Sequence, residues 1–304
     1  MLKIAVAVLR VSQTYINCFL YAIQLQTNTK DNSSMKEKMN HCMLLDCYKG
    51  MEKSYFTGTS GILLPYKNKS YYPEELQDKS RLAVYSLLFN SLEVNSSFYK
   101  IPREETVRRW SEETTDDFRF TFKLWKGITH QKELKFDPQD VARFLSVIDA
   151  IGQKKGCLLI QLPPSFKFAS IGMLVELLDC IAQDKRSEKW QVCVEFRDLS
   201  WYKEETFELL KSYEMHLVIH DKDMQGMRLQ YADAKIIYMR FHGPNGDYKG
   251  SYSDSLLLEY STYINEWIAA GKEVYTYFNN TIGAALPNLN ILASYITANK
   301  IFPA

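Results

Sequence analysis

The stretch YMRFHGPNG, residues 238–246, ends a run of apolar, aromatic and β-branched residues that is typical of a buried strand. Two of its polar side chains, Arg240 and His242, stand two residues apart, so on an extended chain both point to one face. A buried guanidinium without a partner is costly, so opposite charge must face Arg240. The stretch therefore predicts a strand whose carboxyl end presents polar groups to a common site.

Short strand-like runs of this kind recur from Tyr55 onward, and stretches with helical spacing of apolar residues separate most of them. Eight strands with intervening helices favour a single (β/α)8 TIM-type barrel. A doubly wound sheet is the rival, but no glycine-rich turn follows the first strand. The weakest part of the pattern is KDMQGMRLQYADA at 222–234, which is short and polar for a helix. The strands are expected at residues 54–60, 91–95, 118–125, 157–163, 190–197, 216–221, 236–242 and 273–280.

The first fifty residues differ from the rest of the chain. Arg10, Gln13 and Asn17 interrupt their apolar opening run, and no small-residue cleavage site follows, so the run resembles a signal peptide only loosely and is interrupted too often to span a membrane. The next stretch, residues 26–41, is polar and typical of disorder. We interpret residues 1–50 as an N-terminal extension, disordered or extraneous to the natural product, and residues 54–304 as the barrel domain.

Charge and cysteine content limit the classes of function. Lys and Arg exceed Asp and Glu by three in residues 1–50 and fall short of them by two in the remainder. A nearly neutral body offers no broad positive surface for nucleic acid. The six cysteines show no paired spacing, so we expect free thiols in a reducing compartment, the cytoplasm. No membrane partner is expected, and the oligomeric state is left open.

Polar residues gather at the carboxyl ends of the predicted strands. Parallel strands of a barrel bring these ends to one rim, where the active sites of such barrels lie. The alternative is that single members, such as a Glu195–Arg197 pair, only fill and orient the barrel. So many converging polar groups are nevertheless costly to satisfy without a use. The strand ends carry Glu93, Asn95, Lys123, Gln161, Glu195, Arg197, His220, Asp221, Arg240, His242, Asn279 and Asn280.

Predicted loops add three residues to this rim. His130 lies in KGITHQKEL (126–134) and could close over the rim, although a loop histidine is usually solvated. Tyr99 and Trp201 place aromatic rings where they could stack on a sugar or a base. The alternative for both rings is ordinary packing over the top of the barrel.

Seven motifs, in this order, resemble those of the DUF72 family, also called the YecE-like family. The resemblance runs from about Gly58 to Asn280, some three quarters of the chain, and ordered motifs are far more specific than any single short pattern. It implies a TIM-barrel-like fold and a site, but no particular reaction. The motifs are GTSG…YYPEEL (58–76), LFNSLEVNSSFYKIP (88–102), FRFTFKLWKGITH (118–130), LLIQLPPSF (158–166), VEFRDLSW (194–201), YMRFHG (238–243) and VYTYFNN (274–280).

The resemblance also implies which residues form the site. The family pattern falls on the rim residues named above, His220 excepted, and on the three loop residues. One departure concerns the turn after the first strand. The family often has Gly-Trp-x-Tyr there, whereas this chain reads GILLPY at 61–66, with Ile62 in the place of the aromatic residue. Residues 1–50 have no counterpart in the family.

The rim residues suggest recognition of an anion. Arg197, Arg240 and Lys123 would hold a phosphate or carboxylate, to which a guanidinium offers two parallel hydrogen bonds. We therefore expect a small anionic substrate, phosphorylated or sugar-containing. The remaining predicted substrate-binding residues are Glu93, Asn95, Tyr99, Gln161, Trp201, Asn279 and Asn280.

Proton transfer would complete the chemistry. Glu195 is the leading general base and His242 the leading acid, with Asp221 and His130 as further catalytic candidates. The chain is thus interpreted as an enzyme, a hydrolase or a lyase, without a cofactor.

Two other classes of function stay open. A metal-dependent phosphodiesterase, nuclease or sugar isomerase would use His242, Asp221, Glu195 and Glu93 as ligands of a divalent ion. The few histidines, the three cations and the absence of an HExxH motif argue against it. A non-catalytic module that binds nucleic acid or a partner would use the cations and aromatic rings, but the negative body disfavours it.

Overall fold

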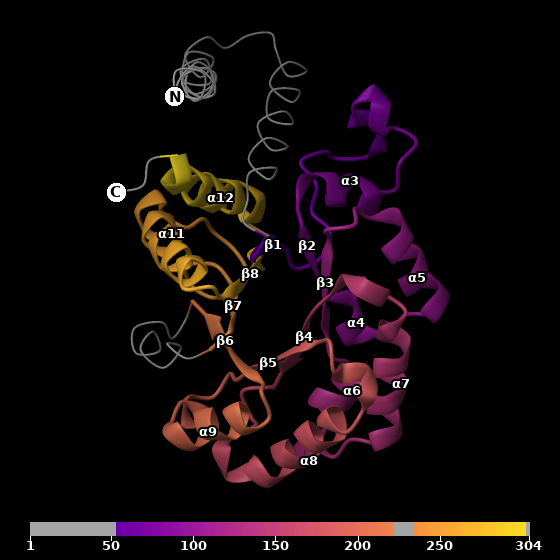
Figure 1. The fold of residues 1–304 in the computed structure, drawn as a ribbon, viewed down its shortest axis with the longest axis vertical. Coiled ribbons are helices and arrows are strands. Elements are labelled where there is room, and N and C mark those ends of the chain that lie inside the picture. The colour runs from indigo at the N-terminus through magenta and orange to yellow at the C-terminus, as the bar shows by residue number, and fades with distance from the viewer. Residues whose placement is uncertain (1–52, 222–233, 302–304) are drawn as a thin grey trace. The chain divides into compact units, whose positions relative to one another are not determined.

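The computed structural model describes residues 53–221 and 234–301, and these residues form eight parallel strands in a nearly closed barrel with helices between them (Figure 1). The (β/α)8 prediction is confirmed, and each strand end lies within two residues of its predicted place. Both the N-terminal extension, residues 1–50, and almost all of the segment 222–234 fall outside the described residues. The strands are β1 (Tyr55–Thr59), β2 (Ser91–Val94), β3 (Arg119–Lys123), β4 (Lys155–Gln161), β5 (Gln191–Glu195), β6 (His216–His220), β7 (Ile236–Phe241) and β8 (Glu273–Phe278).

Helices cover the outside of this barrel. Side chains accept hydrogen bonds at several helix starts, such as Asp137 Oδ1 from the Gln139 amide, with Pro138 as the first helical residue. In Figure 1, α11 and α12 lie side by side against β8. No helix within the described ranges is both long and apolar enough to cross a membrane. The α-helices are α3 (Arg81–Leu88), α4 (Ser96–Tyr99), α5 (Glu104–Glu113), α6 (Lys126–Thr129), α7 (Pro138–Asp149), α8 (Ile171–Ala182), α9 (Glu204–Ser212), α11 (Asp254–Ala269) and α12 (Ala285–Ile301).

Strand pairing follows the chain order from β2 to β8, and β8 pairs with β1. The remaining seam, between β1 and β2, has a single bridge, Ser60–Glu93, in place of a ladder. The Asn90 side chain bridges to β1 on the amino-terminal side of this bridge. Its Oδ1 accepts from the Thr57 backbone N–H at 2.9 Å, and its Nδ2 donates to the Tyr55 carbonyl at 2.7 Å. The two strands come so close at Gly58 that an added Cβ would lie 2.0 Å from the Ser91 carbonyl oxygen.

Alternation along each strand separates two cores. Residues such as Leu217, Ile219 and Phe278 pack outward against the helices. Residues such as Val218 and Tyr277 belong to a second apolar cluster inside the barrel. The inward face of every strand therefore ends at the carboxyl-end rim.

Candidate functional site

Register brings inward-facing polar residues from distant parts of the chain to one level of the barrel. Gln161 of β4 lies beside Glu195 of β5, and His220 of β6 lies beside Arg240 of β7. Glu93 enters the same level from β2 at the bridged seam. The charges thus converge because strands of a barrel are parallel and their side chains alternate.

Arg240 lies at the centre of this level and is bound by two carboxylates. Its Nε and Nη2 donate to the two oxygens of Glu93 at 2.9 and 2.7 Å, and its Nη1 donates to Glu195 Oε2 at 2.5 Å. Ser60 Oγ and the Tyr238 hydroxyl also donate to Glu93. Arg240 and the two glutamates expose no more than 1% of their surface.

These contacts fix the charges of the three groups. Burial alone would raise the pKa of the Glu93 carboxyl, but the positive charge and hydrogen bonds of Arg240 hold it below its usual range. Glu195 is similar, since Arg240 and Arg197 outweigh burial and hold the pKa of its carboxyl well below the usual range. Both carboxylates are therefore ionised at neutral pH and occupied by arginine.

A second group lies above Arg240, where Arg197, His242 and Asn279 follow the ends of β5, β7 and β8. Arg197 Nε is 2.5 Å from Glu195 Oε1, as an ion pair whose N–H does not point along the hydrogen-bond direction. Arg197 Nη2 is 3.1 Å from His242 Nε2, and the amide nitrogen of Asn279 is 3.0 Å from His242 Nδ1. Burial, aided by Arg240 and Arg197, lowers the pKa of His242 to about 4 despite the opposing Glu195, so its imidazole is neutral at pH 7.

Lys123 ends β3 on the inward face and is only 7% exposed. Its Nζ lies 3.9 Å from the centre of the Phe98 ring, and it makes no hydrogen bond or ion pair with a described residue. Burial, followed by the charge of Arg240, lowers the pKa of Lys123 to about 8. His130 packs edge-to-face against the same Phe98 ring, with the ring centres 4.9 Å apart. Burial, followed by the charge of Lys123, lowers the pKa of His130 to about 4.

Two predicted rim residues lie on the helix-facing side instead. Asp221 follows Leu217 and Ile219 at a spacing of two residues and therefore points to the same, outward face. Its Oδ2 accepts from the Tyr252 hydroxyl and from the backbone N–H of His242. Asn280 has the parity of Phe278 and donates to the Gly250 carbonyl and to Asn288 Oδ1. Only one of two consecutive strand residues can point inward, so these two side chains point outward. Both bond backbone groups of the segment that follows β7.

The two aromatic candidates also lie apart from the charged group. Trp201 is fully buried, stacked on Phe196 and Phe166 with its Nε1 bonded to the Phe166 carbonyl, so no ligand can reach its ring in this structure. Tyr99 is 64% exposed and lines a separate surface pocket of about 380 Å³ together with Trp125. The packing alternative stated for Trp201 is the one observed.

The other amide candidates stay near the rim. Gln161 is 8% exposed and its Nε2 donates to the Leu162 carbonyl. Asn95 follows β2 on the inward face, and its Oδ1 is buried without a hydrogen-bond partner among the described residues. Each retains unused hydrogen-bonding capacity.

Three further residues belong to the charged level, namely Ser60, His220 and Tyr238; the sequence pattern places His220 at a strand end but predicts no catalytic or binding role for any of the three. Tyr238 stands two residues before Arg240 and thus on the same face, and it bonds the carboxylate that Arg240 bonds. His220 Nε2 lies 2.9 Å from the Tyr202 hydroxyl, and its ring lies 6.1 Å from that of His242. Strand parity was the signal that would have chosen His220 over Asp221.

Metal binding is poorly matched by these side chains. Both glutamates that could serve as ligands are occupied by arginines. Across the part of the chain that the structure describes, no three His, Cys, Asp or Glu side chains gather as a metal ion would need.

Comparisons with known proteins agree with this fold and these motifs. The model of the family described as "Protein of unknown function DUF72" matches residues 56–300. The YecE protein of Escherichia coli K12 is 37% identical over 100 residues, which are 33% of this chain and 37% of YecE. The YunF protein of Bacillus subtilis 168 is 25% identical over 257 residues, covering 70% of this chain and 85% of YunF.

Solved structures extend the likeness to three dimensions. A DUF72 family protein of Enterococcus faecalis V583 superposes with a TM-score of 0.66 at 20% identity, over 80% of this chain and 95% of its own. A DUF72 family protein of Thermotoga maritima MSB8 gives 0.62 at 26% identity, over 81% and 99%. The resemblance inferred from the seven motifs is confirmed.

Proposed function

This chain belongs to the DUF72 family, and we propose that the carboxyl-end rim of its barrel is the active site of an enzyme. Its substrate would be a small anion, phosphorylated or sugar-containing, and its reaction a hydrolysis or an elimination of the lyase class. The site lies where barrels of this architecture carry their catalytic groups.

One observation carries the proposal: positive charge exceeds negative charge among the side chains at the carboxyl-end rim. Arg240 is fully buried, and its guanidinium is paired with both Glu93 and Glu195. Arg197 and Lys123 then bring two further cations against the remaining charge of one carboxylate. A bound anion would neutralise this excess and accept the free donors of the guanidinium.

The surroundings suggest a role for each group. Arg197, whose side chain is 12% exposed, would bind the anion and is held in place by Glu195. Glu195 suits this positioning better than a base, because two arginines stabilise its ionised form. Neutral His242 and the amide of Asn279 would orient hydroxyl groups, and Lys123, with its lowered pKa, would exchange protons near neutral pH.

Calorimetry with inorganic phosphate and with small sugar phosphates tests the proposal. A charge-assisted hydrogen bond to an anion contributes about 1.5–3 kcal/mol, so Arg197→Ala should weaken binding by roughly tenfold or more. Arg197→Lys should restore binding only in part, because the fork of donors is lost.

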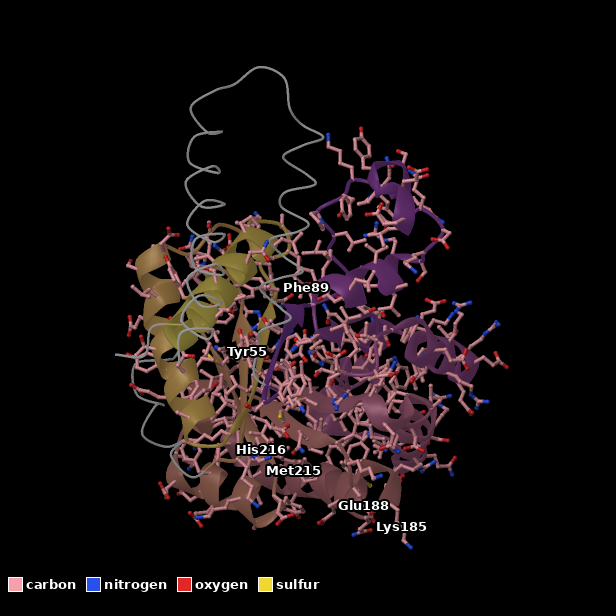
Figure 2. All side chains as sticks on the ribbon, turned by 45° about the horizontal axis from the view of Figure 1, so that its top comes forward. Tyr55, Phe89, Lys185, Glu188, Met215 and His216 are labelled. Carbon is pink, nitrogen blue, oxygen red and sulfur yellow. The ribbon has the colours of Figure 1, made fainter. Side chains whose placement is uncertain are left out.

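Lys185, exposed at the opposite end of the barrel and labelled in Figure 2, provides the matched control. Lys185→Ala removes one positive charge and should leave phosphate binding unchanged. Equal losses in both variants would indicate a general charge effect and contradict the proposed site. Tight Mn²⁺ or Zn²⁺ binding that survives Arg197→Ala and is abolished by Glu195→Gln would favour a metal centre instead.

A further inference from the structure

Lys123 differs from the other lysines that the barrel buries. Lys154 donates to the Ser111 and Thr114 carbonyls at 2.6 and 2.8 Å, and Lys155 is paired with Asp149 at 2.6 Å. Lys123 is buried as deeply, yet among the described residues its ammonium meets only an aromatic face. The Lys123 side chain keeps a small part of its surface exposed, but an ammonium that is largely desolvated and has no acceptor among the described residues is costly, which suggests a function for Lys123.

The groups around Lys123 favour its neutral form. Burial is the largest cause of its lowered pKa, the charges of Arg240 of β7 and Arg197, which follows β5, act in the same direction, and together they outweigh Glu93 and Glu195. A pKa of about 8 raises the neutral fraction at pH 7 by roughly two orders of magnitude over an ordinary lysine. Desolvation and a neighbouring cation are the two devices that turn a lysine into a nucleophile.

We propose that Lys123 forms an imine with the carbonyl carbon of a small anionic aldehyde or ketone bound at the rim. This inference rests on the proposed function and makes it more specific: Arg197 holds the anionic group, and the carbonyl lies over Lys123. An imine also favours lyase over hydrolase chemistry, because it can accept the electron pair of a neighbouring bond as that bond breaks.

The step balances without a further reactant. The neutral amine of Lys123 donates its lone pair to the carbonyl carbon, and the C–N bond forms as the carbonyl π pair moves to oxygen. The oxygen takes up two protons, one from the attacking nitrogen and one that the Lys123 ammonium released on becoming the amine. The C–O bond then breaks with its electron pair on oxygen, water leaves, the nitrogen lone pair forms the C=N bond, and the nitrogen keeps one proton as the iminium. In sum, one ammonium and one carbonyl give one iminium and one water.

Reductive trapping on the full chain tests this directly. The protein is incubated with glyoxylate or glycolaldehyde phosphate and sodium cyanoborohydride, and the modified peptide is identified by mass spectrometry. We expect modification at Lys123 to be at least tenfold faster than at any other lysine. Excess inorganic phosphate should suppress it, whereas modification of Lys185 should not change.

Lys123→Arg keeps the charge but cannot form the adduct, so the fast modification should vanish, and it should persist in Lys185→Arg. Should Lys123→Arg fail to fold, selective protection of Lys123 by phosphate in the unsubstituted protein decides the matter. Slow modification spread over surface lysines, unchanged in Lys123→Arg, would overturn the inference.

The inference and the proposed function can fail separately. Phosphate binding that depends on Arg197, with no adduct at Lys123, would overturn the imine and leave the anion site standing. Propanal reacting at Lys123 as fast as glyoxylate would show that no anionic group is recognised and would overturn the substrate class in both.

Discussion

Two adjacent levels of inward-facing side chains fill the barrel interior, one with neutral hydroxyl groups and the other with charged groups. In the lower level, the Tyr277 hydroxyl lies 2.6 Å from Ser91 Oγ and 2.7 Å from Thr121 Oγ1, and all three residues are fully buried. Two residues further along the same strands, the upper level holds Glu93 and Lys123. The strands begin at the other end of the barrel, away from the rim; Figure 2 labels the first residues of two of them, Tyr55 of β1 and His216 of β6.

The difference separates structure from function within one set of strands. Neutral hydroxyl groups can satisfy one another completely, so the lower level gains nothing from a ligand. The upper level leaves a cation over Phe98 and a neutral imidazole between Arg197 and Asn279. A level that keeps costly, incompletely satisfied charges is where a ligand is expected.

Arg240→Ala should have the largest effect, because it leaves two carboxylates buried without their partner. Breaking such a pair typically lowers the free energy of unfolding by about 3–5 kcal/mol. Urea unfolding at pH 7 measures the loss. Arg119→Ala is the matched control, since Arg119 lies at the amino end of β3 and its guanidinium, among the described residues, donates to the Phe118 carbonyl and lies over the Phe56 ring without pairing with a carboxylate. A loss as large in this variant would remove the distinction between the two ends.

The buried, neutral His242 should make the free energy of unfolding depend on pH in the acid range. Its pKa is about 4 in the folded protein and about 6.5 in an unfolded chain, so the unfolded state binds more protons between these values. The contribution of neutral His242 to the free energy of unfolding is therefore fully present above pH 6.5, and it is lost as the pH falls toward 4. His130 and His216, with pKa values also lowered to about 4, act in the same direction.

His242→Gln should reduce this decline by about 1.4 kcal/mol per pH unit, the share of one proton. Urea unfolding between pH 4.5 and 6.5 provides the slope. An unchanged slope would mean that His242 is already protonated in the folded protein, and the upper level would then carry one more charge.

Lys123→Met should stabilise the protein, because it removes a desolvated cation without an acceptor. The gain at pH 7 is expected to be roughly 1–3 kcal/mol. It should shrink as the pH rises from 8 toward 10.5, where the unfolded lysine also loses its proton. Lys154→Met is the control and should destabilise, since Lys154 donates three hydrogen bonds; if both variants lose stability, Lys123 is structural.

Tyr277→Phe should have the smallest effect. It removes one hydroxyl from the lower level, a loss of about 1 kcal/mol, while Ser91 keeps its bond to the Arg119 carbonyl. Thermal unfolding measures this change, and phosphate binding and Lys123 trapping should stay within twofold of the unsubstituted protein. A large loss of binding would show that the two levels act as one unit.

Composition and periodicity determined much of this protein by themselves. Strand runs, helical spacing and seven ordered motifs fixed the barrel and the family, because these depend on local patterns. They also placed Glu93, Lys123, Glu195, Arg240 and His242 at strand ends. Spacing by two establishes that Arg240 and His242 share a face, and burial cost requires that an opposite charge meets Arg240.

Only the tertiary structure decided which faces point inward and which charges meet. Asp221 and Asn280 turned to the helices because the register of β6 with β7 and of β7 with β8 sets the phase of each strand. Glu93 reaches Arg240 across 147 residues through closure of the barrel, which no local pattern encodes. The occupation of Arg240 by two glutamates, and the isolation of Lys123 beside it, follow from that closure, because a charge finds its partner through space and not along the chain.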